Sequence, residues 1–131
     1  MSNVHRLATN LLPASLDVAV GSLIAVLVLQ AADQPVTVLS WMIGGGLALL
    51  PDLDVVPRIL LGRPVTTDHH QTLFHRPVVM LVGAGAIAYM LGGLIWTGIT
   101  LLALVWHYLH DTGWTTKATG IAWVWPLSSN Y

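Results

Sequence analysis

The sequence predicts an all-α integral membrane protein: a bundle of four short transmembrane helices followed by an interfacial C-terminal segment. Of the 131 residues, 55% are hydrophobic and only 8% are charged, whereas a soluble domain carries about 25% charged residues. A chain of this length forms one domain, so we assign residues 1–131 to a single membrane-embedded domain. The alternative, a soluble bundle with buried helices, fits this composition less well.

Long apolar runs define the expected helices. The second run stops at Pro51, and the third continues from Pro77 to Trp106 without a charged residue. That run is longer than the roughly 20 residues that one span needs. A turn at Gly92-Gly93 divides it into two helices. The four predicted helices are residues 18–32, 36–50, 77–91 and 94–112.

The basic residues predict how the chain is oriented. They are Arg6, Arg58, Arg63, Arg76 and Lys117. With four spans, all of them fall at the N-terminus, in the loop between the second and third helices, or in the C-terminal tail. Because Lys and Arg concentrate in cytoplasmic loops, we expect a multi-pass protein of the inner (plasma) membrane with both termini cytoplasmic. The tail, residues 118–131, is apolar, short and rich in aromatic rings, which is typical of the headgroup region.

Acidic and histidine side chains gather on the same predicted side of the membrane. Residues 68–77 read DHHQTLFHRP and contain three of the six histidines. Asp52 and Asp54 follow the second helix. His107 and Asp111 are spaced i, i+4 near the end of the fourth, which places them on one helix face. Ionisable groups near a bilayer are costly and tend to mark functional sites.

These residue types predict a metal site. The chain has no cysteine, so ligands must come from His and Asp, a set that suits divalent ions such as zinc or manganese. A catalytic zinc typically has three protein ligands, so a larger set implies one or two ions or residues with other roles. Asp54 and His75 are our candidates for proton transfer. The candidate ligands are Asp52, Asp54, His70, His75, His107 and Asp111.

Each of these features also has a purely structural interpretation. The PDLD segment could be a helix end followed by an Asx-turn. His107 and Asp111 could form a hydrogen bond within their helix, although an Asp near a helix C-terminus opposes the macrodipole. Asp17, at the start of the first predicted helix, could be an acid favoured in the first turn.

Four segments, LPDLD, HHQTLFHRP, HYLHDTG and GIAWVWPLS, resemble a known family. It is the family of small membrane-bound metal-dependent hydrolases, bacterial inner-membrane proteins related to a DNA-damage-regulated member. The resemblance covers roughly residues 40–131. It implies that the two acids of PDLD, a pair of histidines five apart and a His–x–x–x–Asp helix form the metal site. The matching residues are Asp52, Asp54, His70, His75, His107 and Asp111.

The sequence also departs from that family's pattern. Gln71 and Thr72 replace Arg-Gly, Phe74 replaces Thr, and Arg76 replaces Ser. Family members often carry a His in the first helix four residues before a Gly, and here Asp17 occupies that place.

Two functions follow as expectations. The leading one is a membrane-bound, metal-dependent hydrolase that cleaves a phosphoester, plausibly lipid-linked, at the cytoplasmic membrane face. The alternative is a non-enzymatic accessory or structural subunit of a larger membrane protein complex that retains the hydrolase-like fold. A transporter or channel is a weaker third option, because the spans carry no charge. Membrane lipids are the expected partners, and the net charge of -1 gives no reason to expect nucleic acid.

Overall fold

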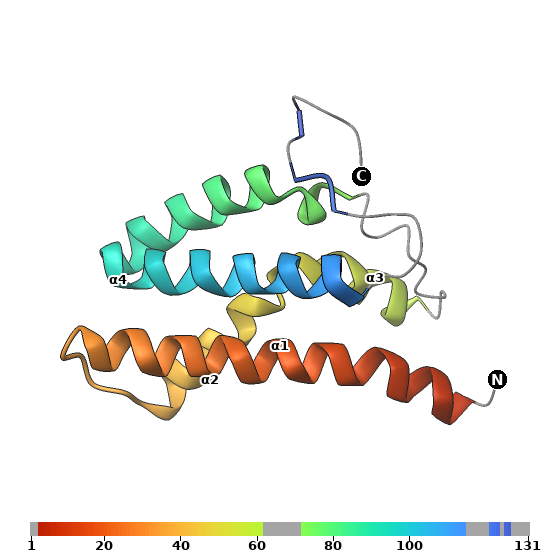
Figure 1. Ribbon diagram of the computed structural model, residues 1–131, viewed down its shortest axis with the longest axis horizontal. Coiled ribbons are helices and arrows are strands. Elements are labelled where there is room, and N and C mark those ends of the chain that lie inside the picture. The colour runs from red at the N-terminus through yellow and green to blue at the C-terminus, as the bar shows by residue number, and fades with distance from the viewer. Residues whose placement is uncertain (1–2, 62–71, 115–120, 124, 127–131) are drawn as a thin grey trace.

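The computed structural model describes residues 3–61, 72–114, 121–123 and 125–126, and the regular elements of this part of the chain are all helical (Figure 1). The all-α prediction is therefore confirmed for the described residues. In chain order the elements are α1 (Asn3–Ala31), α2 (Val38–Ala48), the 3₁₀ helix η1 (Leu50–Asp54), α3 (Val55–Leu60), the 3₁₀ helix η3 (Leu73–His75) and α4 (Pro77–Trp114).

Helix α4 is a hairpin of two arms. Its backbone leaves helical geometry at Gly93, with φ 70° and ψ -163°, a conformation that glycine adopts at little cost because it has no Cβ. The first arm, residues 77–92, and the second arm, residues 94–114, run beside each other in Figure 1. The turn predicted at Gly92-Gly93 is thus present.

Helix α1 begins at Asn3 rather than at residue 18. The segment before residue 18 is less apolar, but it contains good helix formers such as Leu, Ala and Arg, so the helix extends beyond the hydrophobic run. Consequently Asp17 lies in the middle of α1, and the interpretation of this residue as a first-turn acid is wrong. Its side chain is only 2% exposed.

Helix α2 is shorter than the predicted 36–50 because of its caps. Thr37 and Ser40 form a capping box: the Ser40 amide donates to Thr37 Oγ1 at 3.0 Å, and the Thr37 amide donates to Ser40 Oγ at 2.9 Å. At the other end the chain tightens into η1, in which Pro51 occupies one of the first two positions. A proline there has no amide hydrogen to leave unsatisfied.

Small residues bring α1 and α2 into close contact. A Cβ added to Gly21 would lie 2.5 Å from the Gly44 carbonyl oxygen, and one added to Gly44 would lie 2.6 Å from the Gly21 oxygen. Such glycine contacts are typical of membrane helices, whose association depends on close packing. The second arm of α4 then packs on this pair through a cluster centred on Ala25, Leu29 and Ile99.

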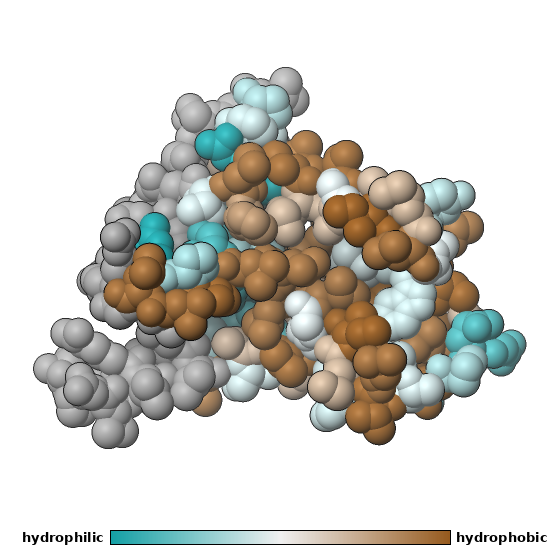
Figure 2. Space-filling model, turned by 180° about the vertical axis from the view of Figure 1, so that it is seen from behind, coloured by the Kyte–Doolittle hydropathy of each residue, from teal (hydrophilic) through white to brown (hydrophobic). Residues whose placement is uncertain are grey.

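The number of spans is two or three by length and composition, and not clearly four. Leu12–Ala31 and Pro77–Gly113 are each long and apolar enough, and Val38–Ala48 with Leu50–Arg58 forms a third only if this pair, bent by 65°, is one span. The prediction of four short helices is therefore met in part: α1 has 29 residues, and α4 is one merged helix with a reversal. The described surface seen in Figure 2 is mostly hydrophobic.

The arrangement gathers distant segments at one end of the molecule. In Figure 1, η1, α3, η3 and the outer ends of both α4 arms lie toward the same end, while the α1–α2 connection and the Gly93 reversal lie at the other. Segments separated by many residues in the sequence thereby become neighbours.

Candidate metal centre

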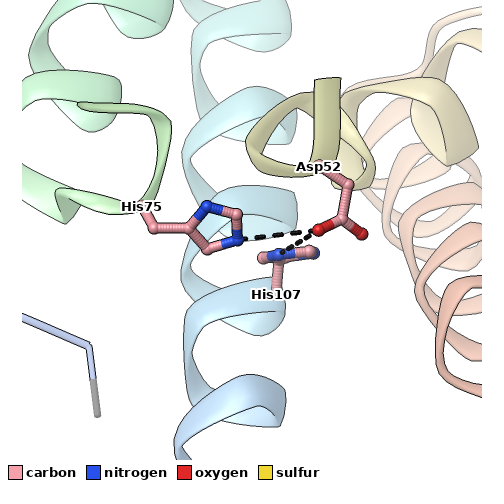
Figure 3. A group of neighbouring side chains, drawn as sticks. All are labelled: Asp52, His75 and His107. Carbon is pink, nitrogen blue, oxygen red and sulfur yellow. Dashed lines mark ion pairs between the residues drawn. The ribbon is translucent and has the colours of Figure 1, made fainter. Parts of the chain in front are cut away.

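Three side chains from three separate elements converge at this end. Asp52 comes from η1, His75 from η3 and His107 from the second arm of α4, and in Figure 3 all three point toward one another. Each offers one donor atom, and these atoms lie within 4.8 Å of one another. Both histidines are fully buried, whereas the Asp52 side chain is 32% exposed. Asp52 is thus the member of the group that solvent reaches most.

The η3 segment is fixed by a hydrogen bond from the second arm. The Tyr108 hydroxyl donates to the Phe74 carbonyl oxygen at 2.7 Å. Tyr108 is itself fully buried, in a cluster with Leu104 and Ile121. Since Phe74 precedes His75, this bond holds the His75 backbone close to the turn of α4 that carries His107.

The spacing of the donor atoms suits a divalent ion. A tetrahedral ion with ligands at about 2.0–2.1 Å has donor atoms roughly 3.3 Å apart. Asp52 Oδ1 lies 3.6 Å from His75 Nε2 and 3.8 Å from His107 Nε2. These separations are longer than an N–H···O hydrogen bond, which spans about 2.7–3.2 Å. The residues present therefore fit a divalent metal ion.

Asp111 adds a second carboxylate to the two histidines. Its Oδ2 lies 3.2 Å from His107 Nε2, one helical turn away, and 3.6 Å from His75 Nε2. The predicted i, i+4 pair thus shares its carboxylate with η3. Two carboxylates face the two imidazoles, and imidazoles ligate in the neutral form, so two ionised carboxylates and two neutral rings would balance the charge of a divalent cation.

A second layer of contacts lies behind His107. Asp17 Oδ2 is 3.3 Å from His107 Nδ1, while Asp17 Oδ1 accepts a hydrogen bond from Trp106 Nε1 at 2.9 Å and lies 2.8 Å from His110 Nδ1. A proton on His107 Nδ1, facing this carboxylate, leaves the lone pair on Nε2, which faces Asp52 and Asp111. Carboxylates orient metal-binding histidines in this way.

The predicted ligands divide into three sets. The structure brings Asp52, His75, His107 and Asp111 together. It does not bring Asp54 into the group: both Asp54 carboxylate oxygens are buried and have no hydrogen-bond partner within the described part of the chain. His70 lies outside the described residues.

Sequence reasoning missed the supporting residues. Asp17 was noted, but its contact with His107 was not predicted, because its helix was expected to begin beside it. Trp106 and His110 were not singled out, although their i, i+4 spacing places them on one face of the helix. Tyr108 gave no signal, since a buried tyrosine in an apolar helix is common in protein cores.

Comparisons with known proteins give one match. A family model described as YdjM inner membrane protein matches residues 16–131. The match starts early enough to include Asp17, which the segments quoted above left out. No curated protein and no solved structure matches the chain. The family match and the apolar helices together support a location in the inner membrane.

Proposed function

This chain belongs to the YdjM inner membrane protein family, and on that premise we propose that it is a membrane-bound, metal-dependent hydrolase of phosphoesters, in particular of lipid phosphoesters. The observation that carries the proposal is the convergence of Asp52, His75 and His107 from three elements onto one point. Catalytic metal sites typically use three protein ligands and keep a position open. The partial exposure of Asp52 is consistent with such an opening.

The proposed orientation places this site at the cytoplasmic membrane face. Each arm of α4 crosses the membrane separately, α1 and the bent α2–α3 pair supply two more crossings, and both termini are cytoplasmic. The proposal is supported by Arg58 and Arg76, which belong to the segments around the metal centre, while the Gly93 reversal at the other end carries no basic residue. A site at this depth is at the level of lipid headgroups.

The chain's residues have distinct roles in the proposed reaction. When bound, a divalent ion supplies Lewis-acid polarisation of a phosphoryl oxygen and lowers the pKa of water. Asp52, His75 and His107 hold the ion, and Asp17 orients His107. Hydrolysis forms a bond from the water oxygen to phosphorus and breaks the bond from phosphorus to the alcohol oxygen.

The proton of the attacking water has to reach the departing alcohol oxygen. Asp111 Oδ2 is the carboxylate oxygen beside both histidines, and the Asp111 side chain is 17% exposed, so we assign it this transfer. His75 is assigned to the ion because its Nε2 faces the two carboxylates. Asp54, predicted for proton transfer from the sequence, is a second candidate with its oxygens buried close to Asp52 in the chain.

The test combines metal analysis with an assay on one substrate. Wild-type protein, Asp52→Asn and Asp33→Asn are purified in mild detergent, and their metal content and release of phosphate from phosphatidic acid are measured. Asp33 is the matched control, an exposed aspartate in the α1–α2 connection. We expect bound divalent metal and hydrolysis in wild type and Asp33→Asn, and loss of both in Asp52→Asn.

Two results would contradict the proposal in different ways. Wild-type protein without bound metal would refute the metal site. Metal bound in wild type and lost in Asp52→Asn, with phosphatidic acid left intact, would refute the hydrolase. Co-purification with a large membrane complex would then favour the accessory subunit.

A further inference from the structure

A large apolar cavity lies between α2 and the two arms of α4. Its volume is about 660 Å³, within the range of about 300–1,000 Å³ that is common for small-molecule sites. Its walls are almost entirely hydrocarbon. The one hydroxyl among its lining residues, that of Thr100, already donates to the Trp96 carbonyl oxygen at 2.8 Å. The cavity therefore suits a hydrocarbon occupant rather than a polar one.

The cavity extends from the metal centre toward the Gly93 reversal. At one end it is lined by Leu50, two residues before Asp52, and by Phe74, directly before His75. At the other end it reaches Leu91. From Val79 to Leu91 the first arm rises by about 18 Å, which is comparable to half of the roughly 30 Å hydrocarbon core of a bilayer.

The proportions of the cavity select one kind of occupant. A volume of about 660 Å³ along about 18 Å of helix rise makes the cavity long and narrow. Its walls come from the apolar helices that are candidate membrane spans, so the hydrocarbon that reaches it is that of the surrounding lipid. A single extended acyl chain matches this length and this apolar lining.

We propose that this cavity binds one acyl chain of a membrane lipid whose phosphoester headgroup lies at the metal centre. The assignment of the headgroup rests on the proposed function, whereas the assignment of the chain rests on the cavity alone. Gly83, on the first arm, keeps part of this space open, since a Cβ added there would meet no atom within 4 Å. The lipid would bind with its chain parallel to the first arm and its ester toward Asp52.

Gly83→Trp tests the proposal because Gly83 lines the cavity and a Cβ there meets no atom within 4 Å, so the added side chain starts in the open space that a lipid chain would occupy. Gly98→Trp is the matched control, since a Cβ at Gly98 also meets no atom within 4 Å and Gly98 does not line the cavity. Both changes replace a helical glycine by a better helix former. Bound lipid is counted by native mass spectrometry, and hydrolysis is compared for dipalmitoyl and dibutyryl phosphatidic acid. Metal content and helicity verify the fold of each variant, and Gly83→Leu replaces Gly83→Trp if the latter does not fold.

We expect wild type and Gly98→Trp to retain a lipid and to hydrolyse the long-chain substrate with kcat/KM at least about tenfold above the short-chain one, because many methylenes become buried. Gly83→Trp should lose the lipid and this preference for the long-chain substrate, while its metal content stays at the wild-type level. Equal lipid retention by Gly83→Trp and wild type would overturn the cavity assignment. If wild type and Gly98→Trp retain the lipid and Gly83→Trp loses it, but none of them hydrolyses either substrate, the proposed function is refuted and the cavity assignment stands.

Discussion

The two ring nitrogens of His107 face two different environments, although both contain carboxylates. On the Nδ1 side, Asp17 is 2% exposed and is held at 2.9 Å by Trp106 and 2.8 Å by His110. On the Nε2 side, Asp111 Oδ2 lies 3.2 Å away and Asp52 Oδ1 lies 3.8 Å away, and their side chains are 17% and 32% exposed. The carboxylate on one side is buried and hydrogen-bonded within the protein, whereas the two carboxylates on the other side are partly exposed.

The two sides of His107 therefore have different roles in the proposed site: Asp17 orients the ring, and the groups at Nε2 bind the ion. Contacts of 2.8–2.9 Å satisfy a buried carboxylate within the protein, which is required because an unpaired buried charge is costly. Donor atoms 3.6–3.8 Å apart at Asp52 are too distant for strong hydrogen bonds but suit ligands that share an ion. His107 thus meets an orienting carboxylate at Nδ1, Asp17 from α1, and a candidate ligand at Nε2, Asp52 from η1.

Removal of His107 should have the largest effect because it eliminates both sides at once. We expect His107→Ala to lose its bound metal entirely, as measured by metal analysis of the purified protein. Leu109→Ala, an exposed neighbour on the same helix, should keep its metal. A His107→Ala protein with a wild-type metal content would contradict the site.

Asp17→Asn should weaken the metal site without removing a ligand. The Asn carbonyl oxygen can still accept from Trp106, but its amide hydrogens would face His107 Nδ1 and favour the tautomer with a proton on Nε2. Loss of such an orienting carboxylate typically lowers metal affinity by about 10–100-fold. Titration against a chelating dye measures the affinity, with Asp33→Asn as the control. An unchanged affinity would show that Asp17 does not orient His107.

Tyr108→Phe should have the smallest effect, because it acts only on the position of η3. It removes the 2.7 Å hydrogen bond to the Phe74 carbonyl oxygen, a change that costs about 1 kcal/mol of unfolding free energy. Chemical denaturation in detergent measures this loss, and metal affinity should fall less than in Asp17→Asn. Tyr89→Phe, on the exposed surface of the first arm, should leave both quantities unchanged. A larger fall in affinity than that of Asp17→Asn would reverse the order.

Much of the fold could be predicted from local sequence. The apolar runs gave the helices, Pro51 and Pro77 gave boundaries, and Gly92-Gly93 gave the reversal. The start of α1 could not be predicted from hydropathy, because the segment before residue 18 is helical without being strongly apolar. The number of spans also depends on how the bent α2–α3 pair and the arms of α4 lie in a membrane, which composition alone does not determine.

Sequence motifs mark several residues of the candidate site. The contacts that depend on tertiary packing have no such local signal. Asp52, His75, His107 and Asp111 all stand in motifs, and their side chains lie close together. The contact between Asp17 and His107 joins residues 90 positions apart, and no local pattern specifies which face of α1 meets the second arm. Asp54 shows the opposite case, since a motif acid is not brought into the group of three.

The contact between Asp17 and the second arm has a consequence for biosynthesis. The centre and its support draw on α1, η1, η3 and the last turns of α4, so they span almost the whole order in which the ribosome makes the chain. An ion can be captured in full coordination only after the second arm has been synthesised and inserted beside α1. In the proposed site, metal loading would therefore be the last step of maturation, and a nascent chain arrested before Trp106 would leave Asp17 without the side chains of the second arm that contact it.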